Sequence, residues 1–308
     1  MQKEKVISFI IPAYNVDESL QKQCIESILQ LDLTREEREI IVIDDGSEKP
    51  CPIDADWWDE QDITYLRQKH KGPSAARNMG IGIASGKYIQ FVDCDDMLFA
   101  KSENYCLDVL RKENADILMF HFTRELKEQA LPDSYPKPID GASYMRTTNL
   151  RGGDCGYVFR KSLLGSLRFE ENLLHEDELF TPQLVLRAEK LIDINATPYY
   201  YRPNNNSITS KKDAKWIKRR LDDFEKVILE LNKGTDTLPY SEREAMKRRV
   251  AQLATDYMYN SLRLTKSVSQ TKQRIKSLKR KGIDTLPNSK YTWKYFIIRK
   301  IYEHIAAG

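Results

Sequence analysis

Three carboxylates crowd the end of one short apolar segment of this 308-residue chain. Tyr88 to Val92 has strand character, and Asp93, Asp95 and Asp96 follow within four positions. Ligands of open α/β sheets bind beyond the carboxyl ends of the strands. Carboxylates at such a place suit Mg²⁺ or Mn²⁺, and Mg²⁺ usually binds together with substrate phosphates. The alternative is a solvated acidic turn that caps the next helix.

Other polar groups stand at comparable places earlier in the chain. They are Pro12 to Asn15, Asp44 to Ser47, and Arg77 with Asn78. Strands predicted from continuous apolar runs precede the first two groups, and a helix rich in small residues carries the third. The predicted order is strand, helix, strand, loop, strand, helix, strand, at residues 6–11, 17–31, 39–43, 49–61, 63–67, 75–84 and 88–92. This alternation predicts an α/β fold with a mostly parallel sheet flanked by helices.

Composition bounds the class of protein. A hydrophobic content of 41% with 31% charged residues is typical of a soluble globular chain. The five cysteines have no CxxC spacing, which favours reduced thiols and a cytoplasmic location. No secretion signal is expected at the N-terminus, and no run of about 18 apolar residues predicts a membrane-spanning helix.

The charge is unevenly distributed along the chain. Residues 265–308 contain eleven Lys or Arg and two acids, a net charge of +9, whereas the whole chain has +3. Residues 291–305 alternate aromatic and aliphatic side chains with basic ones, which suits an anionic membrane surface at the inner membrane face. The alternative is a helix docked on the body with solvated lysines. No recognition motif accompanies the charge, so nucleic acid is not an expected partner.

The ordered set of motifs resembles the family 2 glycosyltransferases, which have the GT-A fold. The segment Gly72-Pro73-Ser74-Ala75-Ala76-Arg77-Asn78 with Gly80 adds to this resemblance, which covers about residues 6–210. It implies a GT-A domain at 1–210, with a nucleotide-sugar half at 1–100 and an acceptor half at 101–210. A helical C-terminal region at 211–308 is predicted separately, from the apolar stripe of Ile217, Leu221, Phe224, Ile228 and Leu231. The resemblance further implies an inverting enzyme of the kind that builds bacterial cell-surface glycans.

The resemblance assigns donor binding to six residues and metal binding to a seventh. Tyr14 would stack on the base and Asp45 would accept the uracil N–H, while Asp93 would face the ribose and Asp95 would hold Mg²⁺ or Mn²⁺. The alternatives are core packing for Tyr14 and the cap of a turn for Asp45. Asp96 is predicted to cap the next helix, with a place in the second layer around the metal as the alternative. The donor-binding residues are Pro12, Tyr14, Asp45, Arg77, Asp93 and Arg202.

Two of these donor groups are basic. Arg77 is suited to a fixed contact with phosphate or base, with a surface salt bridge as its alternative. Arg202, together with Ser207 to Thr209, resembles a family segment that folds over the diphosphate, with a plain loop as the alternative.

A base for the acceptor hydroxyl is also implied. His175-Glu176-Asp177-Glu178 resembles the Glu-Asp motif of the family, with Asp177 in the position of the base. Its alternative is an acidic helix start, which the helix dipole favours. A UDP-sugar donor and a glycan or lipid-linked acceptor are therefore expected. The alternatives are a polyprenyl-phosphate sugar synthase, for which Asp177 would be dispensable, and a non-catalytic protein that binds sugar nucleotides or glycans.

Overall fold

The computed structural model describes residues 5–49, 55–203 and 213–283, together with residues 296 and 300. The chain divides into two units, which are described separately. The first unit comprises Met1–Gly141, Gly153–Asn172 and Gln183–Asn204, and the second comprises Ala142–Gly152, Leu173–Pro182 and Asn205–Gly308. The second unit therefore combines the C-terminal helices with two segments from before residue 210.

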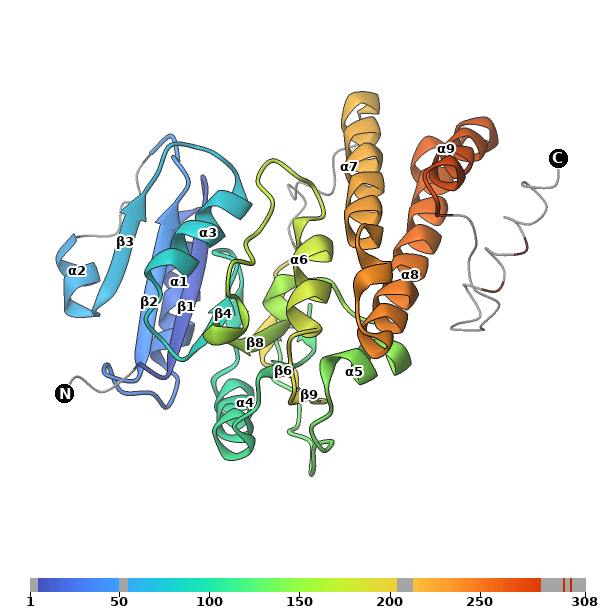
Figure 1. The fold of residues 1–308 in the computed structure, drawn as a ribbon. Coiled ribbons are helices and arrows are strands. Elements are labelled where there is room, and N and C mark those ends of the chain that lie inside the picture. Colours follow the sequence, from blue (N-terminus) through green and yellow to red (C-terminus); the bar gives the residue numbers. More distant parts are fainter. Residues whose placement is uncertain (1–4, 50–54, 204–212, 284–295, 297–299, 301–308) are drawn as a thin grey trace. The chain divides into compact units, whose positions relative to one another are not determined.

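A seven-stranded sheet forms the centre of the first unit (Figure 1). Its order is β3-β2-β1-β4-β8-β6-β9, and β8 alone runs antiparallel to its neighbours β4 and β6. The prediction of a mostly parallel α/β sheet is confirmed. The strands are β1 (Ile7–Ala13), β2 (Arg38–Asp44), β3 (Ile63–Arg67), β4 (Tyr88–Phe91), β6 (Ile117–Met119), β8 (Tyr157–Arg160) and β9 (Leu191–Asp193).

Helices cover both faces of this sheet because side chains alternate between faces along each strand. Ile7, Phe9 and Ile11 of β1 pack in one core cluster with apolar residues of α1 (Glu18–Leu29) and α4 (Ala100–Glu113). The intervening Ile10 faces the other way, toward α3. The remaining helices of this unit are α2 (Ala55–Glu60) and α3 (Pro73–Ile83).

Close packing of α3 on the sheet depends on one small residue. A Cβ added to Gly80 would collide with the side chain of Ile10. The glycine at position 80 is therefore a packing requirement, because it lets α3 approach β1 closely.

A three-stranded sheet also belongs to the first unit. It has the order β5-β10-β7, with β5 (Met97–Leu98), β10 (Tyr199–Tyr200) and β7 (Phe122–Thr123). The short strands β6 and β7 are close in sequence but belong to different sheets.

Helices dominate the second unit, as expected for the C-terminal region. Its long helices are α7 (Ala214–Asn232), α8 (Tyr240–Thr265) and α9 (Val268–Arg280), and α8 packs against both α7 and α9. Most of α5 (Gly141–Thr147) and the first seven residues of α6 (Glu176–Val185) belong to the same unit. Within the described residues, no helix has the length and apolar character to cross a membrane. Short 3-10 turns lie at Asp154–Gly156, Lys161–Leu163 and Thr235–Thr237.

Candidate active site

The predicted donor residues come together at the carboxyl edge of the large sheet. Because β1, β2 and β4 are parallel, their carboxyl ends lie at one edge. The backbone N–H of Asp45 donates to the carbonyl of Ala13 at 2.8 Å, and the N–H of Asn15 donates to Ser47 Oγ at 2.9 Å. The loops after β1 and β2 are therefore joined, and Pro12, near the end of β1, is half-buried between them.

Asp45 is 2% exposed, and its carboxylate is fully occupied. Oδ1 accepts from Gln68 Nε2 at 2.7 Å and from the N–H of Lys71 at 2.9 Å. Oδ2 accepts from the N–H of Gly72 at 2.7 Å and lies 2.8 Å from His70 Nδ1. Asp45 thus organises the loop that leads into α3, so a nucleobase N–H would have to displace a side chain, that of Gln68 or His70.

Asp44 is buried for a structural reason. Its carboxylate accepts from the N–H of Ser47 at 2.8 Å and from the hydroxyl of Tyr65 at 2.8 Å, and it lies 3.2 Å from Arg67 Nε. Burial opposes ionisation, but these hydrogen bonds outweigh it and lower the pKa of Asp44. The residue organises the turn after β2.

Tyr14 is not a core residue. Its side chain is 44% exposed, and its ring stacks on that of His70 with centroids 4.1 Å apart and an interplanar angle of 21°. His70 in turn contacts Asp45. An aromatic face therefore borders the predicted base-binding residues, and a histidine that the sequence analysis had not assigned covers one side of it.

Arg77 is buried in a pair of ionic contacts, so the alternative of a surface salt bridge is wrong. Its guanidinium forms an ion pair through Nε with Asp154 and lies 3.3 Å from Asp93 through Nη2. Arg77 and Asp154 are both nearly inaccessible, with exposed fractions of 6% for each. Burial raises the pKa of Asp93, opposed by Arg77 and reinforced by Asp154 and Asp95. The cluster therefore holds more negative than positive charge.

Asp96 does not cap the following helix, which corrects the prediction. Helix α4 begins at Ala100 without a side-chain cap. The Asp96 carboxylate instead accepts from the hydroxyl of Tyr199 at 2.8 Å and from the N–H of Arg202 at 2.7 Å. Arg202 Nε donates to the carbonyl of Asp95 at 2.7 Å. Burial raises the pKa of Asp96 to about 7. Arg202 and Asp96 thus fix the turn that presents Asp95.

The residues at this turn fit a divalent cation that binds together with phosphates. The Asp95 side chain is only half-buried, and Asp93 and Asp154 add negative charge beside it. Among the described residues, no cluster of three or more His, Cys, Asp or Glu could hold a metal alone. One carboxylate with substrate phosphates is a normal arrangement for Mg²⁺.

Asp177 lies in the second unit, in the first turn of α6. Its Oδ1 accepts from the N–H of Glu178 at 2.8 Å. Glu178 forms an ion pair with Arg249 of α8, and Arg249 also donates to the carbonyl of Leu150 at 2.7 Å. Helices of the C-terminal region therefore hold the turn that carries the predicted base.

Sequence reasoning missed Asp154 and His70. Asp154 stood in a glycine-rich turn with no periodic pattern, and its signal was only an acid in a segment otherwise built of small residues. His70 comes shortly after β3, whose carboxyl end lies next to that of β2. Its place at this edge of the sheet could have identified it as a candidate site residue. Trp57 and Trp58 belong to the local core, because Trp58 is 6% exposed and Trp57 packs against the same cluster. Ser207 to Thr209 lie outside the described residues, as does most of 291–305.

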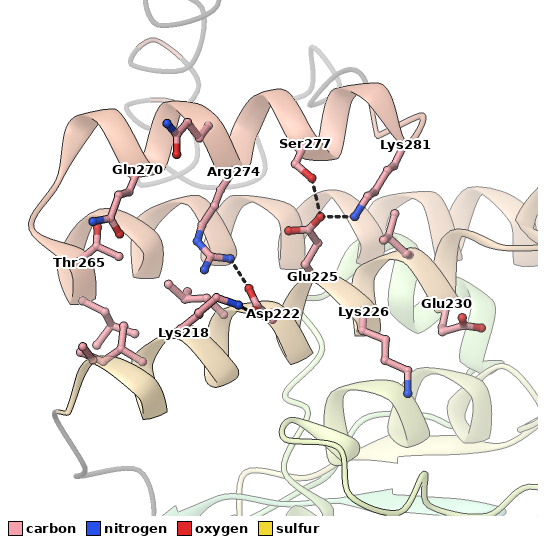
Figure 2. Close-up of a pocket in the computed structure, with 16 residues that line it drawn as sticks. Lys218, Asp222, Glu225, Lys226, Glu230, Thr265, Gln270, Arg274, Ser277 and Lys281 are labelled. Carbon is pink, nitrogen blue, oxygen red and sulfur yellow. Dashed lines mark hydrogen bonds and ion pairs between the residues drawn. The ribbon is translucent and has the colours of Figure 1, made fainter.

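A separate cavity of about 1000 Å³ lies among the helices of the second unit, lined by α7, α9 and the end of α8 (Figure 2). Arg274 and Asp222 bridge it at 2.9 Å, and Glu225 accepts from Ser277 at 2.9 Å and Lys281 at 2.7 Å. None of the predicted site residues lines this cavity.

The chain is similar to known proteins both in sequence and in fold. Residues 8–156 match the model described as Glycosyl transferase family 2. The matched stretch contains all the predicted donor-binding residues except Arg202, and it also contains Asp154.

Named relatives extend the comparison. Glycosyltransferase GlyA of Streptococcus pneumoniae is 29% identical over 274 residues, which cover 80% of this chain but only 37% of that protein. The crystal structure of Staphylococcus aureus TarS 1–349 in complex with UDP-GlcNAc has a TM-score of 0.73 at 18% identity, over 98% of this chain and 87% of that one. The mannosyltransferase PcManGT of Pyrobaculum calidifontis, in complex with GDP-Man and Mn²⁺, has a TM-score of 0.61 at 13% identity, over 99% and 86%. The predicted GT-A fold is confirmed.

Proposed function

We propose that the chain is an inverting glycosyltransferase that moves a sugar from a UDP-sugar to a hydroxyl of a glycan or lipid-linked acceptor in cell-surface glycan synthesis. The observation that carries the proposal is the group of Tyr14, Arg77, Asp93 and Asp95 at one sheet edge within the matched family 2 domain. The complex of TarS with UDP-GlcNAc supports the choice of a uridine nucleotide.

Each donor-binding residue contacts a different part of the nucleotide. Tyr14 has an exposed ring on which the base can stack. Asp45 accepts the base N–H after the side chain of Gln68 or His70 has moved away from its carboxylate. Asp93 accepts from a ribose hydroxyl, and Arg77 supplies positive charge beside it. These contacts orient the donor so that its anomeric carbon is open to attack.

The diphosphate is the leaving group and needs its charge balanced. Asp93, Asp95 and Asp154 give this edge an excess of negative charge, which would repel a free diphosphate. Asp95 is the residue that would hold Mg²⁺ or Mn²⁺, and the complex of PcManGT with Mn²⁺ supports a divalent cation in this fold. When bound, the cation supplies Lewis-acid stabilisation of the departing nucleoside diphosphate.

Proton transfer falls to Asp177. In the proposed step, its carboxylate accepts the proton of the acceptor hydroxyl as the hydroxyl oxygen bonds to the anomeric carbon. The bond between that carbon and the UDP oxygen breaks, and its electron pair leaves with UDP. A single displacement inverts the anomeric configuration.

The basic C-terminal region supports a contact with an anionic membrane surface. Helix α9 carries Lys272, Lys276 and Arg280 at intervals of four residues, and none of the three forms an ion pair with a described residue. Like charges at this spacing weaken a helix, so stability does not explain them. We infer that this face meets acidic lipid headgroups while the acceptor is presented.

The proposal is tested with a screen of nucleotide sugars and two variants. With Mn²⁺ present, the wild type should release UDP from at least one UDP-sugar. Asp177→Asn should lower the rate of that release about 100- to 10,000-fold while UDP still binds, and Asp95→Asn should weaken binding of UDP in the presence of Mn²⁺. Sugar transfer to polyprenyl phosphate retained in Asp177→Asn would point to a polyprenyl-phosphate sugar synthase, and absence of turnover with every nucleotide sugar would contradict the proposal.

A further inference from the structure

The residue that precedes α6 has an unusual backbone. His175 has a φ of +65°, in the left-handed region that non-glycine residues seldom occupy. Such a conformation persists where surrounding contacts enforce it. His175 stands two positions before Asp177, so the contacts that enforce its conformation also define how the chain enters the first turn of α6.

Helix α7 supplies these contacts, within the same unit. The imidazole of His175 stacks on the ring of Phe224, with centroids 4.6 Å apart and an interplanar angle of 25°. The neighbouring Asp223 accepts from the N–H of Leu174 at 3.1 Å through Oδ2. Two adjacent residues of α7 therefore hold the ring of His175 and the backbone just before it.

The stack itself is rigidly placed. Phe224 is 4% exposed, and its ring meets that of Tyr257 on α8 edge-to-face, with centroids 5.9 Å apart. Within the described residues, His175 Nε2 is buried without a hydrogen-bond partner. Burial, with Arg220 nearby and Asp223 opposing, lowers the pKa of His175 to about 4. The imidazole is thus neutral at physiological pH and acts here by packing.

A second anchor holds the other side of Asp177. Glu178 is paired with Arg249 of α8, and a Cβ on Gly152 would collide with the Glu178 carboxylate. Asp177 therefore lies between two residues, His175 and Glu178, that separate helices of the C-terminal region fix in place.

We propose that His175 is a positioning residue, which through its stack on Phe224 sets the orientation of the Asp177 carboxylate for proton transfer. This inference rests on the proposed role of Asp177 as the base. It gives α7 a part in the reaction, because displacement of a reacting group by about 1 Å can cost a hundredfold in rate.

Two variants separate the ring contact from folding. His175→Asn keeps a residue type that tolerates the left-handed region but removes the imidazole. Phe224→Leu keeps a buried apolar side chain but removes the aromatic face. The matched control is Ile228→Val, which trims a fully buried residue one turn further along α7 and leaves the stack intact.

The assay follows UDP release with Mn²⁺ and the UDP-sugar that the wild type turns over fastest in the screen, together with UDP binding by calorimetry. His175→Asn and Phe224→Leu should lower kcat about 10- to 100-fold, with KM for the donor and Kd for UDP within about twofold of wild type. Ile228→Val should leave all three constants within about twofold. In an Asp177→Asn background, His175→Asn should have no further effect on residual turnover, because there is no base left to orient.

The possible failures are distinguishable. A kcat within twofold of wild type for both variants, with the turnover of Asp177→Asn strongly reduced, would overturn the positioning role. So would an equal fall in kcat with and without the Asp177→Asn change, since that indicates a general structural effect. Unchanged turnover in Asp177→Asn itself would remove the base from the proposed function, and the positioning role would fall with it.

Discussion

A buried glutamate in the core of the first unit makes its stability depend on pH. Glu103 of α4 is 0% exposed, and within the described residues its carboxylate accepts one hydrogen bond, from Gln90 Nε2 at 3.4 Å. Gln90 of β4 is also 0% exposed. Desolvation raises the pKa of Glu103 from 4.5 to about 7, and the contact with Gln90 opposes this weakly. The perturbation to make is Glu103→Gln, which keeps the shape and removes the charge.

The direction in which stability changes with pH follows from proton binding at Glu103. Between pH 4.5 and 7 the folded state keeps the proton on Glu103 while the unfolded state releases it, so stability falls as the pH rises through this window. Below that window the group is protonated in both states, and above it the cost is fully present. At 1.36 kcal/mol per pKa unit, the shift amounts to about 3 kcal/mol. Glu103→Gln should therefore become more stable than the wild type by about 2 to 3 kcal/mol more at pH 8.5 than at pH 5.

Urea denaturation from pH 5 to 8.5 measures this difference. Subtracting the wild-type curve from that of Glu103→Gln removes the contributions of other groups, Asp96 included. Glu171→Gln serves as the control, because Glu171 is exposed, and its difference from wild type should stay within about 0.5 kcal/mol at every pH. A difference between Glu103→Gln and wild type that does not grow with pH would refute a raised pKa at this position.

Two further predictions concern charge at other places in the chain. Asp154→Asn leaves the buried Arg77 with a weaker partner. It should lower the free energy of unfolding, measured by urea denaturation, by about 3 kcal/mol. A loss below about 1 kcal/mol would show that the pair is not needed for folding. Replacement of Lys272, Lys276 and Arg280 by Ala should weaken sedimentation with vesicles rich in phosphatidylserine by about a hundredfold, at about 1 kcal/mol per cation. Phosphatidylcholine vesicles are the control, and equal binding of wild type and variant to acidic vesicles would rule out this face as the contact.

Local sequence pattern predicts the parallel strands β1 to β4 of the large sheet and the edge at which the candidate site lies. Continuous apolar runs such as Val6 to Ile11 identify buried parallel strands, and polar residues directly after them must meet at one edge. Asp45 and Asp95 were found by this rule, which depends only on local pattern and strand direction. The helical nature of the C-terminal region followed equally from the apolar period of α7.

The partner of each candidate site residue is known only from the tertiary structure. Arg77 forms an ion pair with Asp154, and Tyr14 stacks on His70. Asp96 accepts a hydrogen bond from Tyr199 and does not cap the helix that follows it. These partners are separated by tens of residues in the chain and repeat with no period, so a one-dimensional pattern carries no signal for them. Their pairing depends on how strands and helices pack, because buried charges and hydroxyls must find whichever complementary group the fold brings within reach.

The turn around Asp177 shows the same division. Its acidic motif was legible in the sequence, and so was the apolar stripe that contains Phe224. That the two are in contact, with His175 held in a left-handed conformation between them, followed only from the packing of α7 against this turn. Local sequence identifies the groups that are candidates for the reaction, whereas contacts between distant segments fix their orientation.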